Sequence, residues 1–509
     1  MKMAYLVNSL LAGALAAVLY LFQRSWSKAA SARQLGCQPP FSYPHIDLIF
    51  GLDLKLREVK KALEFRSIPF NTELFNIYGK TYQVNVFGSA TIRTIDPANI
   101  QTAYATNNKD WGYEPMRLPV MGPFCGRGFI TTDGATWKAS RALLRPTFSK
   151  ANVSDLSPFQ RSVDSFLQQI PRDGSIVDMQ PLIATLFLQT AIKFLLGDSL
   201  DVLGGAGKSE DAKIFLEAFH NSMFGMGLSF LIGPFQFLVP KALKATAWQR
   251  AHTFIDTCVD AALHDQIQAQ ERDDLDNQAD SYSHGHSLLE GLAKQTDDRI
   301  AIRNQILQAM MAAQDTTSIL LSNTLFLLSR NPAAYERLRK EALSIDVDAS
   351  LTLFNDLKEL KFLSNVLDES LRLYPIFPIM DRVALNDTTL PVGGGEKRDF
   401  PIYIPHGTRI ASNYYALHRD ESVFGPDVEV FNPDRWNSIS PGPWEYMPFS
   451  GGPRACVGQH KALAEASYTL VRIAQLFRGL ESRDEKDWAG ELKLTARNAN
   501  GCKVALIPA

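Results

Sequence analysis

The segment FSGGPRACVG, residues 449–458, places Cys456 among glycines, a proline and Arg454, just before a stretch with helical spacing of apolar residues. A cysteine at the start of a helix has its thiolate stabilised by unpaired backbone N–H groups and by the helix dipole. The glycines allow the backbone to approach a large flat ligand closely. Arg454 carries the charge needed to pair with a carboxylate of such a ligand.

Three other roles are open to Cys456. A lone cysteine before a helix is often a small buried side chain without chemistry. His460 lies four residues later on the same helix face, but no second cysteine or histidine pair completes the four ligands of a zinc site. The same two residues would make a poor nucleophile and base, because both lie on one helix without a third group to orient them.

The segment resembles the haem-binding signature of the cytochromes P-450, F-x-x-G-x-R-x-C-x-G. The signature positions are occupied by Phe449, Gly452, Arg454, Cys456 and Gly458. The resemblance implies that the cofactor is haem (heme, iron protoporphyrin IX) and that Cys456 is the axial thiolate ligand of its iron. It also implies a mostly α-helical fold with small β-sheets.

Two further motifs follow in the order that the family has. ESLR contains Glu369 and Arg372 of the family's E-x-x-R helix, and FNPDRW contains Arg435, which the resemblance places in a buried cluster with them. Residues three apart share a helix face, and one carboxylate can accept from two guanidinium groups. We expect this cluster to hold the core and to take no part in the chemistry.

Arginines at two more positions match the family. Trp137 and Arg141 in WKASR match its W-x-x-x-R helix, and Arg382 in PIFPIMDR matches a further arginine. The resemblance implies that Arg141, Arg382 and Arg454 face the haem carboxylates. Without the other motifs, Arg141 would be interpreted as a solvated residue of an amphipathic helix.

Polar residues interrupt a long apolar helical pattern at AAQDTTS, residues 312–318. A carboxylate and hydroxyls in such a pattern are costly to bury and therefore indicate function. The segment resembles the family's oxygen-activation motif, which implies that Thr316 hydrogen-bonds dioxygen and that Asp315 relays protons. Ala313 departs from the glycine usual there. The alternative is a hydroxyl that bonds only to the carbonyl four residues earlier.

The N-terminus contains an uncharged apolar run at residues 3–22, about the length needed to cross a bilayer. Arg24, Lys28 and Arg33 follow it, which favours a cytoplasmic location for the rest of the chain. The run is longer than the apolar core of a usual signal peptide, so an anchor is favoured over a cleaved peptide. We expect a single-pass anchor at residues 1–23 in the endoplasmic reticulum membrane, a proline-containing linker at 24–50 and one catalytic domain at 51–509.

Spacing of apolar residues predicts mostly helices with small sheets. A hairpin is expected within residues 81–97, with a helix opening at Asp96, and a second β region around residues 401–412. Long helices are expected at residues 138–148, 300–328, 357–373 and 458–477.

The wider resemblance is to the fungal alkane and fatty-acid hydroxylase branch. Ala139, Gln314, Ala455 and Val457 depart from that branch, so a fungal secondary-metabolite oxidase acting on a polyketide or terpenoid is equally open. Either substrate is lipophilic. Its contacts are expected from residues 219–240, from residues 376–380 and near Ala496.

Partners follow from what the chain lacks. It shows no flavin or NADPH motif, so an NADPH-dependent flavoprotein reductase is expected to supply electrons near Lys138, Arg145 and Lys461. The formal net charge is -2, which gives no electrostatic reason to expect a nucleic-acid partner. A haem isomerase or dehydratase that needs no reductase, and a non-catalytic haem binder, are the alternatives, and Asp315 and Thr316 argue against both.

Overall fold

The computed structural model describes residue 23 and residues 26–197, 210–273, 287–347 and 353–509. The chain divides into two compact units, each made of separate stretches of sequence. The smaller unit contains residues 1–55, 73–112 and 381–412, and the larger contains residues 56–72, 113–380 and 413–509. The apolar run of the expected anchor, residues 3–22, lies outside the described residues.

The smaller unit is built on a five-stranded sheet with the strand order β1-β2-β8-β5-β3. The predicted hairpin is confirmed, because β1 pairs antiparallel with β2 from Thr81 opposite Thr94 to Val86 opposite Ser89. The Asp96 side chain then accepts from Ala98 N at the start of the next helix, as the sequence predicts. The bounds are β1 Thr81–Val86, β2 Ser89–Thr94, α4 Pro97–Gln101, η1 Thr102–Thr106, β3 Trp111–Gly112, β5 Ile379–Ala384, β6 Thr388–Gly394, β7 Phe400–Ile404 and β8 Arg409–Asn413.

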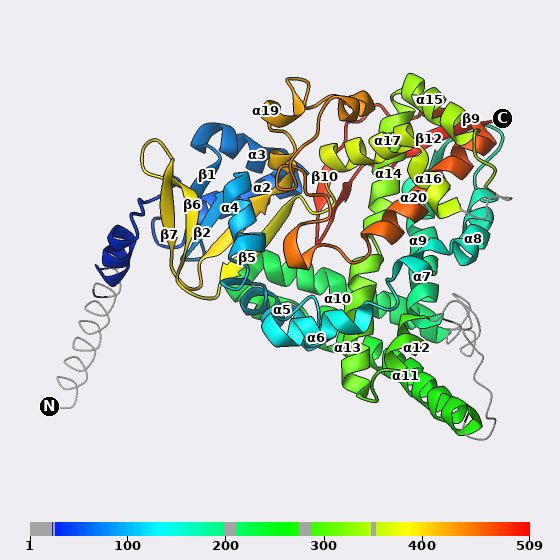
Figure 1. Cartoon of the computed structure of the whole chain (residues 1–509), viewed down its shortest axis with the longest axis horizontal. Coiled ribbons are helices and arrows are strands. Elements are labelled where there is room, and N and C mark those ends of the chain that lie inside the picture. The colour runs from blue at the N-terminus through cyan, green and yellow to red at the C-terminus, as the bar shows by residue number, and fades with distance from the viewer. Residues whose placement is uncertain (1–22, 24–25, 198–209, 274–286, 348–352) are drawn as a thin grey trace. The chain divides into compact units, whose positions relative to one another are not determined.

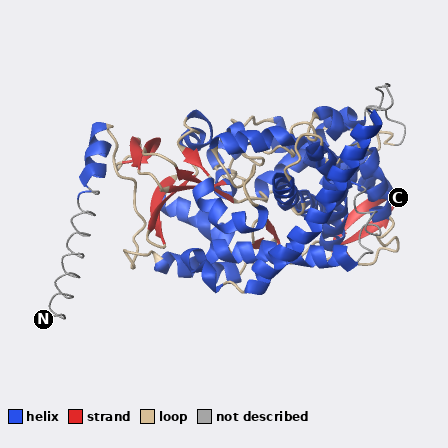
Figure 2. Ribbon diagram, turned by 90° about the horizontal axis from the view of Figure 1, so that it is seen from below, coloured by secondary structure: helices blue, strands red, loops and turns tan. Residues whose placement is uncertain are grey.

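Helices dominate the larger unit. Figure 2 shows in blue that most of the described chain is helical. Small two- and three-stranded sheets lie among them, in the orders β10-β11 and β4-β12-β9. Its helices are α5 Glu114–Cys125, α6 Gly134–Leu144, α7 Lys150–Ser154, α8 Ser157–Leu167, α9 Met179–Leu196, α10 Glu210–Ile232, η3 Gly233–Leu238, η4 Lys241–Leu243, α11 Ala245–Asp273, α12 Leu288–Ala293, α13 Arg299–Ala313, α14 Thr316–Ser329, α15 Pro332–Ala342, α16 Leu353–Glu359, α17 Lys361–Leu373, α18 Tyr414–Leu417, α19 Glu421–Phe424, η5 Pro433–Asn437, η6 Gly452–Arg454 and α20 Gln459–Leu476. Its strands are β4 Val177–Asp178, β9 Phe477–Ser482, β10 Gly490–Leu492, β11 Ala496–Asn498 and β12 Lys503–Pro508. The helices α2 Leu52–Leu63 and α3 Ser67–Tyr78 cross a boundary between the units.

The long helix predicted at residues 300–328 is wrong in one respect, because it is two helices. α13 ends at Ala313, Gln314 and Asp315 are not helical, and α14 begins at Thr316. From Thr317 to Ser329 every residue of α14 is buried. It packs against α9, α17 and α20 (Figure 1). A helix buried on all sides belongs in the centre of a core.

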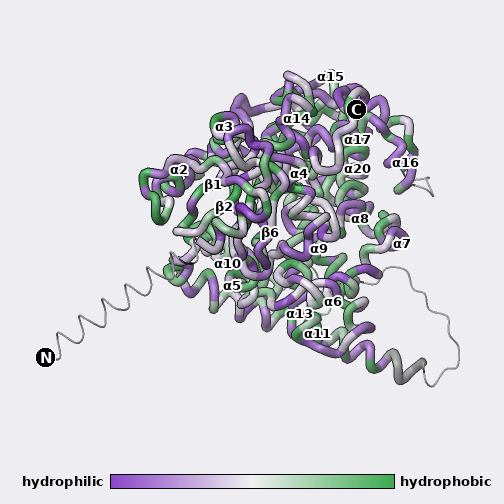
Figure 3. The backbone as a smooth tube through the Cα atoms, turned by 60° about the vertical axis from the view of Figure 1, so that its left-hand side comes forward, coloured by the Kyte–Doolittle hydropathy of each residue, from purple (hydrophilic) through white to green (hydrophobic). Residues whose placement is uncertain are grey.

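Helices at the edge of the larger unit have a different pattern. Figure 3 shows both hydrophobic and hydrophilic stretches along α11, which packs against α10 through residues such as Phe254 on Phe215. Among the described residues, α9 is the one helix long and apolar enough to cross a membrane, and almost half of it is buried in the protein. Its burial is typical of a core helix.

Candidate active site

The loop before α20 holds Cys456 in a fixed position. Cys456 N donates to the carbonyl of Phe449 at 3.0 Å, which closes the loop around the short helix η6. Gly452 has a φ of +68°, a left-handed conformation that favours glycine. α20 then begins at Gln459, so the sulfur lies at the N-terminus of an 18-residue helix.

The electrostatics of Cys456 are balanced between opposing effects. Burial raises the pKa of the Cys456 thiol, while the N–H groups of Gly458 and Gln459 and the charge of Arg141 lower it. The predicted N–H donors are present, but burial outweighs them. The cysteine is exposed although protein surrounds it on most sides. A metal ion bound at this sulfur would hold it as the thiolate.

The glycines of the loop serve different purposes. A Cβ added at Gly451 would lie 2.6 Å from the Trp444 ring, so this glycine is required by the protein's own packing. A Cβ at Gly458 would make only ordinary contacts, 3.8 Å from Phe148 and 4.0 Å from the Cys456 sulfur. Packing against Trp444 therefore explains Gly451, and the space beside Gly458 leaves the close approach of a flat ligand there as a prediction.

α6 brings Trp137 and Arg141 to the cysteine loop. Arg141 Nη2 donates to the carbonyl of Ala455, next to Cys456, at 2.7 Å. The guanidinium of Arg454 lies over the Trp137 ring at 4.4 Å. Burial lowers the pKa of Arg141, because desolvation disfavours its charge. Two cations and an indole therefore line one side of the loop.

Asp315 and Thr316 occupy the break between α13 and α14. The Thr316 hydroxyl donates to the carbonyl of Ala312, four residues earlier, at 3.0 Å. This is the bond that the alternative interpretation predicted, and it leaves the hydroxyl oxygen able to accept. Desolvation by the surrounding protein raises the pKa of Asp315 although the residue is partly exposed, and the positive charges of Arg497 and Lys493 oppose that rise. A carboxyl of this kind is more easily protonated than an ordinary one.

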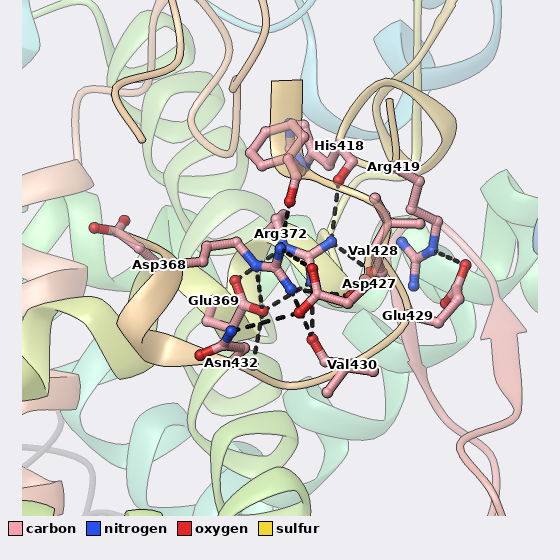
Figure 4. A network of polar contacts seen from close by, with 12 residues as sticks. Asp368, Glu369, Arg372, His418, Arg419, Asp427, Val428, Glu429, Val430 and Asn432 are labelled. Carbon is pink, nitrogen blue, oxygen red and sulfur yellow. Dashed lines mark hydrogen bonds and ion pairs between the residues drawn. The ribbon is translucent and has the colours of Figure 1, made fainter. Parts of the chain in front are cut away.

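Glu369 stands at the centre of a buried polar network (Figure 4). Its carboxylate accepts from Arg372 at 2.8 and 2.9 Å and from Arg435 Nε at 3.1 Å. Trp436 Nε1 and Asn432 N also donate to it. The three residues expected to form a cluster therefore lie together, away from solvent, and have the partners of a structural group.

Arg382 lies in the smaller unit, where 3% of it is exposed. Its guanidinium stacks on Tyr104 at 3.8 Å, and its Nη1 donates to the carbonyl of Asp381. Its expected role toward haem carboxylates stays a prediction.

Two of the segments expected to contact substrate are joined directly. Ala496 N, on β11, donates to the carbonyl of Ile376 at 2.8 Å. The third segment divides into two parts, because Phe219 and Met226 are fully buried in α10 whereas residues 235, 237 and 238 are 49 to 74% exposed. Core packing therefore accounts for the buried residues of α10, such as Phe219 and Met226, and not for the exposed residues 235, 237 and 238.

The basic residues expected to meet a reductase differ in their surroundings. Lys138 and Arg145 are exposed. Lys461 is ion-paired with Glu465 on the next turn of α20 and lies over the Phe194 ring, so its charge is compensated.

The donor set suits a haem and does not suit a zinc ion. An accessible sulfur at a helix start, two backbone N–H groups near it and adjacent arginines match a thiolate ligand and the carboxylates of a porphyrin. In the described part of the chain, no three His, Cys, Asp or Glu side chains are grouped to hold a metal ion. Comparison with known families decides the matter, because the family model described as Cytochrome P-450 matches residues 55–498. The chain belongs to the cytochrome P-450 family.

Several relatives of this cytochrome P-450 are fungal proteins. It is 38% identical to Cytochrome P-450 monooxygenase himC of Aspergillus japonicus, over 92% of the chain and 84% of that relative. It is 35% identical to Cytochrome P-450 monooxygenase fsdH of Fusarium heterosporum, over 92% and 83%. It is 37% identical to Cytochrome P-450 52E2 of Candida apicola, over 88% and 87%. The chain is therefore a monooxygenase of this family, whose cofactor is a thiolate-ligated haem.

Sequence patterns missed two residues of this cytochrome P-450. Asp133 pairs with Arg454, and His220 bonds to Gln314. The two members of each pair lie far apart in the sequence, so no local pattern joins them. Asp133 precedes a helix as an N-cap residue does, which concealed its contact with the cysteine loop. No local pattern marked His220.

Proposed function

We propose that this cytochrome P-450 is a membrane-anchored monooxygenase that inserts one oxygen atom of dioxygen into a C–H bond of a lipophilic substrate. The second oxygen atom leaves as water, with two electrons from NADPH delivered by a flavoprotein reductase and two protons. The observation that carries the proposal is the accessible Cys456 sulfur at the start of α20, with the N–H groups of Gly458 and Gln459 directed to it.

Each group near the cysteine has a role in this proposal. Cys456 is the ligand of the haem iron, and Arg141 and Arg454 hold haem carboxylates. The ring of Trp137 stacks against the guanidinium of Arg454 and supports it. Bound haem supplies the redox chemistry that activates dioxygen. Backbone N–H groups near the sulfur withdraw electron density from it and so tune that chemistry.

Proton delivery falls to the break between α13 and α14. The raised pKa of Asp315 suits a carboxyl that takes up a proton and releases it within one cycle. The Thr316 hydroxyl is held by its bond to the carbonyl of Ala312, which directs its oxygen lone pairs away from that carbonyl. In this position the oxygen can accept a hydrogen bond from a proton donor. If the O–H turns away from the Ala312 carbonyl, the hydroxyl can instead donate to the reacting oxygen.

A lipophilic substrate is supported by the apolar side chains at the surface of η3. Phe235, Phe237 and Leu238 are exposed there, next to a helix that lines the core. With the uncharged run at residues 3–22, they favour a chain that sits at a membrane and takes its substrate from it. Among the relatives are monooxygenases of filamentous fungi and a Candida cytochrome P-450, so we propose a fungal secondary metabolite or an alkyl or fatty-acid chain as substrate.

The test is oxygen accounting in membranes that contain the full chain and its reductase. Thr316→Ala is expected to keep haem and to lower product formed per NADPH about tenfold or more, since a positioned proton donor contributes about 10²–10⁴-fold. Thr324→Ala is the matched control, because Thr324 lies on the same helix and also donates to the carbonyl four residues earlier. An equal yield of product per NADPH in both variants would remove Thr316 from the proposed role. Product formation without any NADPH consumption would favour the isomerase or dehydratase alternative.

A further inference from the structure

An ion pair lies directly beside the cysteine loop. Arg454 Nη2 donates to Asp133 Oδ1 at 2.6 Å and to the carbonyl of Thr132 at 2.8 Å. The exposed fractions of the two side chains are 15% and 13%. A charged hydrogen bond that short and that buried is strong, since little water competes for it.

Asp133 is positioned by its backbone neighbours and does not serve the helix that follows it. Its carboxylate accepts from Tyr113 N at 2.9 and 3.0 Å and from Glu114 N at 2.8 Å. It is the N-cap residue of α6, yet its side chain makes no capping bond. An aspartate before a helix usually caps it. Here the carboxylate is directed at the cysteine loop instead.

The segment that carries Asp133 is clamped from α13. Gln308 is fully buried, accepts from Ile130 N at 2.7 Å, and donates to the carbonyl of Cys125 at 2.9 Å and to Thr131 Oγ1 at 3.2 Å. The Thr132 hydroxyl donates to the carbonyl of Gly128 at 2.7 Å. The carboxylate of Asp133 is therefore presented on a rigid loop.

We propose that Asp133 is a positioning residue for Arg454, and that it sets the electrostatic field which Arg454 exerts on the haem. The ion pair fixes the guanidinium over Trp137 through its Nη2 atom. It also places a negative charge against the arginine, so that the haem edge meets a partly neutralised cation. This inference concerns the cofactor's redox poise and goes beyond the proposed reaction.

The sign of the effect follows from charge. Reduction of the ferric iron adds a negative charge to the haem, so a nearby carboxylate opposes it and a nearby unpaired cation favours it. Removal of the Asp133 charge acts in one direction by two routes. A negative charge near the haem is lost, and the positive charge of Arg454 is offset by one carboxylate fewer. The reduction potential must then rise.

The experiment is spectroelectrochemical titration of the haem-loaded full chain without substrate or reductase, so its result does not depend on the proposed monooxygenase reaction. Asp133→Asn keeps an oxygen that can accept from Tyr113 and Glu114. It is expected to raise the ferrous-to-ferric ratio at a fixed potential about tenfold, which is about 59 mV for one electron. Asp133→Glu keeps the charge and is expected to stay within about threefold of the parent chain on the same scale.

Glu114→Gln is the matched control. Glu114 lies on the adjoining helix, accepts from Asp133 N at 3.1 Å and pairs with Arg127, and Asp133 stands between it and Arg454. We expect it to change the ratio less than threefold. An unchanged potential in Asp133→Asn, or an equal shift in Glu114→Gln, overturns the inference. If Asp133→Asn loses haem, we expect Asp133→Glu to retain it, because the carboxylate charge is kept. Loss of haem from both variants also overturns the inference, because the charge of residue 133 would then not be what positions Arg454.

Discussion

Gln314 and His220 are joined by a hydrogen bond of 2.7 Å between Gln314 Nε2 and His220 Nε2. An amide nitrogen can only donate, so with this amide orientation the imidazole nitrogen accepts and its proton lies on Nδ1. Gln314 is buried in the break between α13 and α14, and His220 lies on α10. The bond therefore ties α10, which leads into the apolar segment η3, to the residue next to Asp315.

Breaking this bond is expected to loosen substrate binding. Gln314→Leu should raise the dissociation constant of a lipophilic substrate about five- to tenfold, since a buried hydrogen bond contributes about 1 kcal/mol. Spectral titration of the haem measures it. Gln268→Leu is the control, because Gln268 forms the same kind of pair with His264 at an exposed place on α11. A double-mutant cycle with His220→Leu should show coupling, and strictly additive losses would contradict the account.

The Glu369 network predicts a large stability loss. Glu369→Gln leaves the buried Arg372 guanidinium without its carboxylate partner and removes one of the two carboxylates that pair with Arg435, which is expected to cost about 3–5 kcal/mol of unfolding free energy. Asp434→Asn breaks the exposed pair with Arg337 and is expected to cost less than about 1 kcal/mol. Urea unfolding followed by circular dichroism compares them. Similar losses of unfolding free energy in both variants would show that burial does not make the Glu369 ion pairs more important for stability than an exposed pair.

Asp368, next to this network, predicts a pH dependence of stability. Burial raises the pKa of Asp368 to about 6, although the Tyr446 hydroxyl donates to it at 3.1 Å. In the unfolded chain its pKa is about 3.9, so the folded state binds more protons between about pH 4 and pH 6. Burial is tolerated by the protonated Asp368 and opposed by the ionised one. The free energy of unfolding therefore falls as the pH rises from about 4 to about 6.

Asp368→Asn removes this titration while keeping an oxygen for Tyr446. The variant should be more stable than the parent chain above pH 6, and the difference should vanish below about pH 4. Urea midpoints measured from pH 4 to pH 8 give the result. A constant difference across that range would mean that Asp368 does not titrate as its burial requires.

The features that could be predicted from the sequence are those set by residues close together in the chain. The hairpin of β1 and β2 and the loop before α20 could be predicted because turn residues and the motif around Cys456 act over a few positions. The break after Ala313 could not, since the polar residues there were interpreted as a functional site within one continuous helix, and the Gln314 bond to His220 is tertiary. Asp133 was missed for the same reason. An aspartate before a helix predicts a cap, and only the fold brings Arg454 to it from 321 positions away.

The central claim is that Cys456 ligates haem iron as a thiolate, and the absorption spectrum of the reduced carbon monoxide complex tests it most directly. The full chain is expected to show the long-wavelength Soret band of thiolate ligation, and Cys37→Ser, at a buried cysteine of the smaller unit, is expected to keep it. Cys456→Ser is expected to lose the band. A band that survives in Cys456→Ser, or a parent spectrum with the shorter-wavelength band of imidazole ligation, would contradict the account.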